Sequence, residues 1–370
     1  MTDAEYHLAN IAEWVKRETP TESAASVNLL VDDIECGLRE TGVHTQRIPG
    51  RDGLGDHLVA RVAGRRAGPG VFIVGHVDTV WPLGTLERMP FRVEGDRAFG
   101  PGIYDMKAGS YLGYEALRRL AHAPPELPVT MLFNADEEIG SPTSRDLIEA
   151  EARNALYALV PDPGVGADRA VVTARKGWGR FQMKVKGRPA HAGANHERGR
   201  SAVAELARQI LALEAMTNYE SGVTVNVGVV SGGTRLNVVP AFAGAEIDLR
   251  ALTLADAERV AALILARKPV GPEVEVTVEG GVNRPPFERS AGVSALYDKA
   301  KGFAAELGFN LPQTMRGGVS DGNFTAALGV PTLDGLGCCG DGAHADNEHI
   351  LVSSIPQRLA LMIALTSRLG

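Results

Sequence analysis

Apolar side chains recur at helical spacing in the first part of the chain. They return every three or four positions over 4–17 and again over 22–41, and this period predicts two amphipathic helices. The Thr-Pro-Thr-Glu segment at 19–22 precedes the second helix and Gly42 follows it, as the start and stop signals of a helix do.

The pattern then changes to short β-rich runs separated by Gly-rich turns. These runs predict strands at 43–48, 57–63, 71–76, 129–135 and 156–160, with a helix at 107–121 among them. A helix at 293–308 and apolar runs near 330–336 and 356–366 complete the group after the Pro285-Pro286 break. The alternation of strands and helices favours an α/β domain with a mixed, mostly parallel sheet covered by helices.

A different pattern lies between these two parts. Four segments alternate apolar and polar residues, and amphipathic helices near 197–214 and 254–268 separate them in the order β-α-β-β-α-β. This order predicts an antiparallel sheet with both helices on one face, as in ferredoxin-like modules. We therefore expect a catalytic metal-binding domain formed by 1–176 and 284–370, and an inserted ferredoxin-like α+β domain at 177–283.

Composition narrows the class of partner. The chain has 370 residues, of which 44% are hydrophobic, so it is long enough for two domains with their own cores. Its formal net charge is -7 and neither sign forms a long run, which argues against nucleic acid and anionic membranes as partners. No apolar run reaches the roughly 18 to 20 residues that a membrane helix needs.

The cysteines and the N-terminal residues favour the cytoplasm. Cys36, Cys338 and Cys339 are too few for a disulfide framework, and adjacent cysteines rarely pair with each other, so a reducing compartment fits best. Residues 1–18 carry acids where a secretory signal carries bases, and they contain no unbroken apolar stretch. We therefore expect a cytoplasmic protein.

Ionisable side chains gather at the ends of the predicted strands, where open sheets place their ligands. His76 and Asp78 follow a buried strand, and a spacing of two lets both side chains point the same way. A histidine that binds a metal usually donates its other N–H to a carboxylate or carbonyl, so this pair indicates a ligand with an orienting acid. A surface turn is the alternative. Trp81, three residues further on, either lines the substrate entrance or packs in the core.

Asp105 lies in the Gly-rich segment GPGIYDMKAG, immediately before a predicted helix. The glycines let the backbone pass closely, which leaves the carboxylate free to coordinate a cation. A helix cap is the alternative for an aspartate at this position.

Three consecutive acids, Asp136, Glu137 and Glu138, end the strand that contains LFNA. Burial of unpaired charge is costly, so we expect a cation beside them. Neighbouring carboxylates can divide two tasks, one binding a metal and the other transferring protons. A solvated acidic turn is the alternative.

Two further donors complete the set. Asp162 follows another strand between two prolines, and His344 lies in the Gly-rich segment GDGAHADNEHI. Two imidazoles, three carboxylates and a spare glutamate suit two divalent metal ions that share a bridge, with Zn²⁺ favoured and Mn²⁺ or Co²⁺ as alternatives. Such a pair would hold a bridging water, lower its pKa and polarise a scissile carbonyl, while Glu137 handles protons.

The order of these motifs resembles that of a family of zinc metallopeptidases. The segments GHVDTVWP, FRVEGDRAFGPGIYDMKAG, LFNADEEIGS, GRPAHAG and GAHADNE occur in the family's order and approximate spacing along nearly the whole chain. The family includes glutamate carboxypeptidase, acetylornithine deacetylase, succinyl-diaminopimelate desuccinylase and N-acyl amino acid hydrolases, and this chain most resembles the glutamate carboxypeptidases. The resemblance implies a metal-dependent hydrolase, a metallo-exopeptidase or amidohydrolase.

The resemblance also implies a role for each matched position. The implied metal ligands are His76 and Asp162 for one ion, Glu138 and His344 for the other, and Asp105 as the bridge between the two. Glu137 would be the general acid/base, and Asp78 the residue behind the first histidine. As in relatives, the peptide bond after Asp105 is expected to be cis.

The inserted domain serves as lid and dimerisation surface in this family, so the resemblance implies a homodimer through it. His191 in GRPAHAG stands where relatives place a histidine near the substrate, often reaching it from the partner subunit, and it would stabilise the developing oxyanion. A substrate carboxylate needs a guanidinium or amide partner, for which Arg250, Asn237 and Arg316 are candidates. An ordinary surface position is the alternative for each.

These inferences predict cleavage of an amide bond in a small peptide or N-acyl amino acid with a free carboxylate. Asp162 stands where glutamate carboxypeptidases have glutamate, which leaves the polarity of the substrate open. A deacylase, desuccinylase, dipeptidase or other small amidohydrolase with the same metals is the alternative. A catalytically silent dimeric binding module is the alternative from another class, and the retained Glu137 beside Glu138 argues against it.

Overall fold

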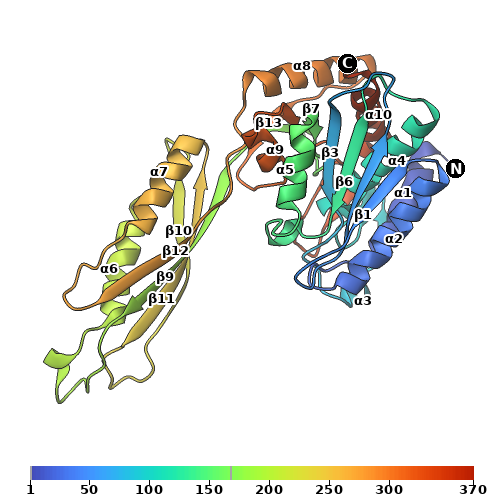
Figure 1. The fold of residues 1–370 in the computed structure, drawn as a ribbon. Helices are drawn as coiled ribbons and strands as arrows, with labels where there is room; N and C mark the ends of the chain where they lie inside the picture. Colours follow the sequence, from blue (N-terminus) through green and yellow to red (C-terminus); the bar gives the residue numbers. More distant parts are fainter. Residues whose placement is uncertain (1, 167–168) are drawn as a thin grey trace. The chain divides into compact units, whose positions relative to one another are not determined.

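The computed structural model describes residues 2–166 and 169–370, and its chain divides into two compact units (Figure 1). The large unit comprises Met1–Ala174, Arg289–Arg316 and Ser320–Gly370, and the small unit comprises Arg175–Glu288 with Gly317–Val319. The small unit therefore interrupts the large one in the sequence. No helix among the described residues is long and apolar enough to cross a membrane.

A six-stranded sheet forms the centre of the large unit. Its strands, in their order across the sheet, are β1 (His44–Ile48), β2 (His57–Val62), β6 (Val129–Asn134), β3 (Gly70–His76), β7 (Ala155–Leu159) and β14 (Thr332–Leu333). β3 pairs in parallel with both β6 and β7, and β7 with β14, while β1 and β2 are antiparallel to their neighbours. The prediction of a mixed, mostly parallel sheet is confirmed.

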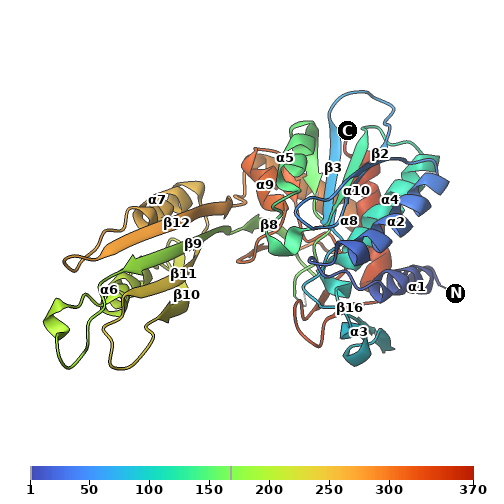
Figure 2. The ribbon, with the colours of Figure 1, turned by 60° about the horizontal axis from the view of Figure 1, so that its bottom comes forward.

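Helices cover both faces of this sheet (Figure 2). One face carries α1 (Asp3–Lys16), α2 (Ala24–Glu40), α4 (Ala108–His122), α8 (Ala291–Glu306) and α10 (Ser354–Arg368), and the other carries α5 (Arg145–Arg153) and α9 (Gly322–Ala327). Successive residues of a strand point to opposite faces. Val71 and Ile73 therefore pack in the first core, whereas Phe72 and Val74 pack in the second.

The carboxyl ends of β3, β6 and β7 lie at the same edge of the sheet because these strands run parallel. β3 ends at His76, the loop after β6 contains the short helix η2 (Glu137–Ile139), and the loop after β7 contains Asp162. Polar residues that are far apart in the sequence are thereby gathered at one edge.

A second, four-stranded antiparallel sheet in the large unit supports this edge. Its strands are β15 (Gly340–Asp341), β16 (His349–Leu351), β5 (Arg97–Phe99) and β4 (Arg92–Glu94). β16 pairs with β5, and this pairing brings the residues before β16 beside the loop that leads from β5 into η1 (Ile103–Lys107). Shorter elements are α3 (Thr85–Arg88) and the two-stranded sheet of β8 (Val171–Arg175) and β13 (Gln313–Arg316).

The small unit has the predicted β-α-β-β-α-β order. Its elements are β9 (Gly177–Lys186), η3 (His196–Arg198), α6 (Ala202–Glu214), β10 (Thr224–Gly232), β11 (Phe242–Ala251), α7 (Leu254–Leu265) and β12 (Glu275–Arg284). The strands form an antiparallel sheet in the order β10-β11-β9-β12, and alternate side chains such as Phe181 and Ile247 pack against both helices. The ferredoxin-like fold is confirmed.

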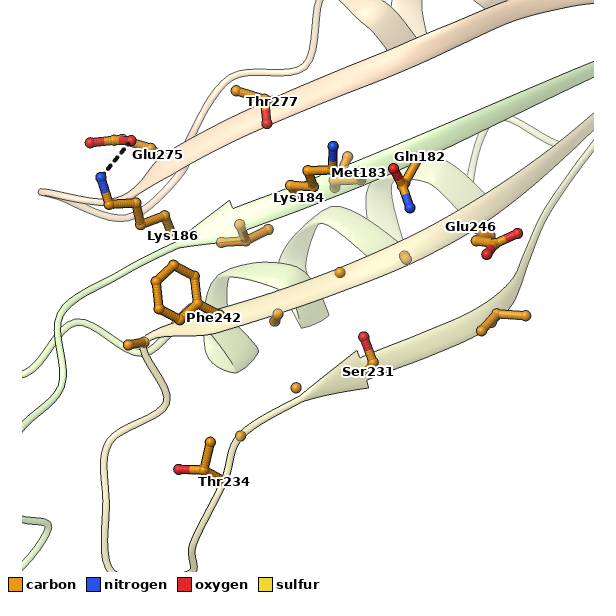
Figure 3. A pocket seen from close by; sticks show the side chains of 18 of the residues that line it. Gln182, Met183, Lys184, Lys186, Ser231, Thr234, Phe242, Glu246, Glu275 and Thr277 are labelled. Carbon is orange, nitrogen blue, oxygen red and sulfur yellow. Dashed lines mark hydrogen bonds and ion pairs between the residues drawn. The ribbon is translucent and has the colours of Figure 1, made fainter.

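The opposite face of this sheet has no helical cover and contains a hollow lined by Lys184, Phe242 and Thr277, among other residues (Figure 3). Cross-strand ion pairs lie on this face, including Lys184 with Glu279 at 3.1 Å. Within residues 2–166 and 169–370, the one group of potential metal ligands lies in the large unit.

Candidate metal centre

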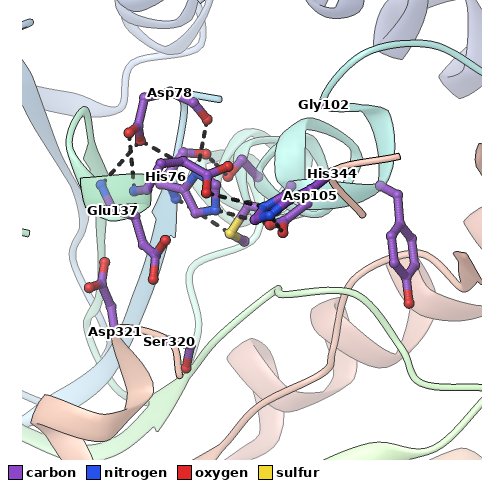
Figure 4. Close-up of polar contacts among 12 residues, drawn as sticks. His76, Asp78, Gly102, Asp105, Glu137, Ser320, Asp321 and His344 are labelled. Atoms are coloured by element: carbon purple, nitrogen blue, oxygen red, sulfur yellow. Dashed lines mark hydrogen bonds and ion pairs between the residues drawn. The ribbon is translucent and has the colours of Figure 1, made fainter. Parts of the chain in front are cut away.

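His76 ends β3 and is buried, with 2% of its side chain exposed (Figure 4). Its Nδ1 lies 3.0 Å from the carbonyl oxygen of Asp78. A carbonyl oxygen can only accept a hydrogen bond, so Nδ1 carries a proton and Nε2 is the nitrogen available to a metal. Nε2 points at Asp105, whose Oδ1 is 3.2 Å away. This is the arrangement of a metal-binding imidazole.

The Asp78 carboxylate is fully buried and joins three segments. It lies 3.4 Å from His76 Nδ1, and it accepts hydrogen bonds from the backbone N–H of Glu137 and Glu138 at 3.2 and 3.3 Å. The hydroxyl of Thr21 donates a further bond of 2.8 Å. Asp78 therefore ties the turn of the three acids to the end of β3, besides lying behind the first histidine.

Asp105 lies between two imidazoles. Its Oδ1 faces His76, and its Oδ2 lies 3.4 Å from Nε2 of His344. α4 begins at Ala108 with Lys107 as its N-cap residue, so Asp105 is not the cap of that helix. The peptide bond that follows Asp105 is cis, as the resemblance implied.

Glu138 forms a group of three potential metal ligands with His76 and Asp105. The ligand atoms of the three side chains all lie within 4.8 Å of one another. Its Oε2 is 3.3 Å from Nε2 of His344, a residue with a left-handed φ of 61° in the loop before β16. Its Oε1 is buried and has no hydrogen-bond partner among the described residues. A buried carboxylate oxygen without a hydrogen-bond donor is costly, and a bound cation would remove this cost.

The pKa values of these groups follow from the excess of carboxylates. Burial lowers the pKa of His76, but the carboxylates of Asp105 and Asp78 hold that pKa well above its usual value. Hydrogen bonds to Asp105 and Glu138 raise the pKa of His344 to about 10, and burial raises the pKa of Glu138. Protons on the two histidines thus neutralise part of the negative charge of the carboxylates. A divalent cation would neutralise more of this charge, and the imidazole nitrogens would bind it in place of a proton.

The remaining two members of the predicted site lie on the same edge of the sheet. Asp162 is buried, with 8% exposure, on the loop after β7, but it is not one of the three grouped donors. Glu137 is partly buried, and its backbone is held by Asp78. The metal-binding role of Asp162 and the proton-transfer role of Glu137 stay predictions.

Asp136, the first of the three acids, is hydrogen-bonded by neutral groups. It accepts hydrogen bonds from the backbone N–H and hydroxyl of Thr143 at 2.6 and 2.7 Å, and from those of Ser144 at 3.2 and 2.5 Å. The expectation of a cation beside all three acids therefore does not extend to Asp136, which holds the start of α5.

Glu348 is a buried residue of this site that the sequence did not single out. Its carboxylate accepts hydrogen bonds from the backbone N–H of Gly102, Tyr104 and Asp105 and from the indole of Trp81. Burial raises the pKa of Glu348 to about 7, and these donors oppose the rise. Trp81 is 8% exposed, so it packs in the structure. The available signal was an acid four residues after His344 in the same loop.

Arg316 is exposed at the end of β13 in the large unit. Burial raises the pKa of the Tyr104 phenol, and the positive charge of Arg316 opposes this rise. Tyr104 precedes Asp105 in the chain, so the guanidinium of Arg316 acts electrostatically on the loop that presents the central carboxylate.

The other three candidates lie in the small unit. Arg250 forms a bidentate pair with Asp248, at 2.9 and 3.0 Å, and lies over the ring of Trp178. Asn237 accepts a backbone hydrogen bond of 3.0 Å from Ala192, which places its loop beside that of His191.

His191 is exposed, and its ring orientation is set locally. Its Nδ1 accepts the backbone N–H groups of Gly193 and Ala194, at 3.1 and 3.2 Å. Because Nδ1 is an acceptor here, Nε2 carries the proton and is available as a donor.

Imidazoles and carboxylates at the carboxyl edge of an open α/β sheet are the arrangement of a metal-dependent hydrolase. The sequence model of peptidase family M20/M25/M40 matches residues 72–368, and the chain belongs to this family. It is thus a metallopeptidase-type hydrolase.

Individual relatives agree with this assignment. Carboxypeptidase G2 from Pseudomonas sp. (strain RS-16) is 32% identical over 371 residues, which cover 98% of this chain and 89% of the relative. Acetylornithine deacetylase from Myxococcus xanthus is 26% identical over 343 residues, or 88% of each chain. The solved structure of aminopeptidase PepT from Bacillus cereus ATCC 10987 matches the fold with a TM-score of 0.77 at 21% identity, covering 99% of this chain and 98% of the other.

Proposed function

We propose that this protein is a two-metal hydrolase that cleaves an amide bond in a small peptide or N-acyl amino acid with a free carboxylate. The observation that carries the proposal is the convergence of His76 and His344 on the two oxygens of Asp105. The buried Oε1 of Glu138, which has no hydrogen-bond partner among the described residues, adds a carboxylate oxygen that a cation would satisfy.

The donor set fits divalent ions that accept nitrogen and oxygen ligands. The residues that would hold them are His76, Asp105, Glu138, Asp162 and His344. Zn²⁺ suits this mixture best, with Mn²⁺ or Co²⁺ as alternatives. When bound, such ions would polarise the substrate carbonyl and lower the pKa of the attacking water.

Glu137 is the proposed general acid/base. Its carboxylate takes a proton from the attacking water as the oxygen adds to the amide carbonyl carbon, and returns this proton to the leaving nitrogen as the C–N bond breaks. His191 would donate its Nε2–H to the oxygen that becomes negatively charged. The two backbone bonds to its Nδ1 keep the ring in the required tautomer.

The substrate carboxylate is the part of the proposal that distinguishes it from related activities. Arg316 is the candidate in the large unit, and Arg250 and Asn237 are those in the small unit. The name of the relative carboxypeptidase G2 supports removal of a terminal amino acid. The acetylornithine deacetylase relative favours the second candidate, a deacylase or another small-substrate amidohydrolase with the same centre.

We also propose a cytoplasmic homodimer that associates through the small unit. β10 is an edge strand of its sheet, and Val229 and Val230 on it are 57% and 58% exposed. Leu211 on the adjoining helix α6 is 74% exposed. Exposed apolar side chains beside an unpaired edge favour a protein contact there. The free thiols of Cys36, Cys338 and Cys339 suit a reducing compartment.

A substrate panel tests the proposal. Chelator-stripped protein is reconstituted with Zn²⁺, Mn²⁺ or Co²⁺ and assayed against N-acyl amino acids, dipeptides and folate-like glutamates. Release of an amino acid from substrates with a free carboxylate, and not from their amides, is the expected result. Hydrolysis that is indifferent to chelation would contradict the proposal, and hydrolysis of carboxylate-free substrates at equal rates would favour the second candidate. A metal-loaded protein that hydrolyses none of them would favour the silent binding module.

A further inference from the structure

Glu348 is completely buried, and its carboxylate accepts four hydrogen bonds. Its Oε1 accepts the backbone N–H of Tyr104 at 2.9 Å and that of Asp105 at 3.0 Å. Its Oε2 accepts the backbone N–H of Gly102 at 2.9 Å and the indole N–H of Trp81 at 2.7 Å. Three of the four donors are thus main-chain groups of the loop that presents the Asp105 carboxylate.

The segment that carries Glu348 is also held by its own backbone. Its backbone N–H donates to the carbonyl of Ala345 at 2.9 Å, and β16, which starts at the next residue, pairs with β5. His344 lies only four residues earlier. One short segment therefore carries both an imidazole that faces Asp105 and the carboxylate that holds the Asp105 backbone.

We propose that Glu348 is a positioning residue of the metal centre: it holds the backbone of residues 102–105 so that the Asp105 carboxylate lies between the two imidazoles. This role rests on the proposed function, because it presupposes that Asp105 binds metal. Ligand distances in metal sites are met to within about 0.2 Å, so a small shift of this loop weakens binding. Residues behind the ligands of a metal affect its affinity in this way.

The surroundings of Glu348 require a carboxylate and no other group of its size. An ionised carboxylate only accepts hydrogen bonds, whereas an amide has one accepting oxygen and one donating nitrogen. In a Glu348→Gln protein, the amide nitrogen would face N–H donors in either orientation of the side chain. The loop has to move to separate the donors, and Asp105 moves with it.

A role in general stability alone is the competing explanation, and Glu205 in the small unit provides a matched control for it. Glu205 is 1% exposed and accepts the backbone N–H groups of Val270 and Gly271, each at 2.8 Å. The amide of Gln209 donates a third bond of 2.8 Å. The guanidinium of Arg208 also lies 3.3 Å from Oε2 of Glu205. Glu205→Gln therefore places an amide against two backbone N–H groups, as Glu348→Gln does, in a unit that carries none of the proposed metal ligands.

The test compares full-length unmodified protein with Glu348→Gln and Glu205→Gln. Each is stripped with a chelator and titrated with Zn²⁺ in competition with a chromophoric chelator, and then with Co²⁺, whose visible spectrum reports ligand geometry. We expect Glu348→Gln to weaken Zn²⁺ binding by about 10- to 100-fold and to alter the Co²⁺ spectrum. Glu205→Gln is expected to lower the unfolding temperature and to leave both metal readouts unchanged.

Unchanged Zn²⁺ affinity and an unchanged Co²⁺ spectrum in Glu348→Gln would overturn the positioning role. An equal loss of affinity in Glu205→Gln would also overturn it, because the loss would then follow from lower stability. Failure of the unmodified protein to bind Zn²⁺ or Co²⁺ is a separate result, since it refutes the proposed function and the positioning role with it.

Trp81→Phe keeps the proposal testable where Glu348→Gln does not fold. It removes one donor to Glu348 and leaves the carboxylate and the three main-chain bonds in place. We expect a weakening of Zn²⁺ binding by about 2- to 10-fold, below the effect of changing the carboxylate itself. An affinity equal to that of the unmodified protein would overturn the role.

Discussion

Asp136 and Glu138 are two residues apart on one turn, and their surroundings are opposite. Asp136 accepts four hydrogen bonds from Thr143 and Ser144, all from neutral donors. Glu138 has one buried oxygen without a donor among the described residues and one that faces His344. A carboxylate whose oxygens are fully used by neutral donors serves the fold, whereas one with an unused buried oxygen is suited to a cation.

Glu137 lies between these two acids and extends the comparison to catalysis. We expect Glu137→Ala to lower kcat by about 10²- to 10⁴-fold, because proton transfer by a positioned side chain contributes that much. Metal content and unfolding temperature should stay the same. Steady-state kinetics on metal-loaded protein check this, with the exposed Glu94→Ala as control. Unchanged kcat would remove Glu137 from the mechanism.

Neutralising each of the other two acids should separate fold from metal binding. Glu138→Gln is expected to weaken Zn²⁺ binding by about 100-fold or more, the upper end of what residues behind a ligand cause. Asp136→Asn is expected to lower the free energy of unfolding by about 1–3 kcal/mol, because its new amide faces donors. Chelator competition and urea denaturation measure the two effects. Weaker Zn²⁺ binding in Asp136→Asn, together with lower stability but unchanged Zn²⁺ binding in Glu138→Gln, would show that the comparison is wrong.

The stabilisation of the fold by bound metal should depend on Glu138 and not on Asp136. At a free Zn²⁺ concentration of about 100 times the Kd, binding should raise the free energy of unfolding by about 2.7 kcal/mol. Denaturation with and without Zn²⁺ measures this gain. Asp136→Asn should retain it and Glu138→Gln should lose most of it, so equal gains in both variants would contradict the assignment.

The pH dependence of metal-free protein sharpens the contrast further. The pKa of His344 is raised to about 10 in the folded state, against about 6.5 in an unfolded chain. The folded state binds more protons, so this stabilisation is complete below about pH 6.5 and is lost as the pH rises toward 10. The raised pKa of Glu138 acts in the same direction.

Urea denaturation at several pH values between 6.5 and 10 checks this expectation. Stability of the metal-free protein should fall with rising pH, and Zn²⁺ should suppress the fall because it replaces the proton. His344→Gln is the control and should flatten the metal-free profile. A stability that rises with pH across this window would contradict the electrostatic account.

The prediction with the smallest expected effect compares two arginines, of which one already has a charged partner. Arg250 already has a bidentate partner in Asp248, whereas Arg316 is exposed beside the Asp105 loop. We expect Arg316→Met to raise KM for a carboxylate substrate by about tenfold, roughly one charge-assisted hydrogen bond. Arg250→Met should raise it less. Kinetics with matched acid and amide substrates would detect a reversal of this order.

Much of this fold could be predicted from the sequence because periodicity is a local property. The strands at 71–76 and 129–135 and the β-α-β-β-α-β order of the inserted segment are visible as runs and alternations. The positions of His76 and Glu138 follow from the same reasoning, since the ends of parallel strands meet at one edge.

Pairing between distant segments could not be predicted in this way. β5 and β16 have three residues each, too few to show a period, and their pairing determines where Glu348 lies. The different surroundings of Asp136 and Glu138 depend on which way Thr143 and Ser144 point, and no spacing rule gives that. The sequence therefore indicated the candidate metal ligands, but not the residues that hold these ligands and their loops in position.

The pairing of β16 with β5 also determines when this centre can form during synthesis. His76, Asp105, Glu138 and Asp162 leave the ribosome before the small unit, whereas His344 and Glu348 emerge after it. Nascent chains of this length grow at about 5–20 residues per second, and domains generally fold as they emerge. The inserted unit can thus complete its fold before the chain carries His344 and Glu348, so the proposed metal site can be assembled only after both parts of the large unit have been made.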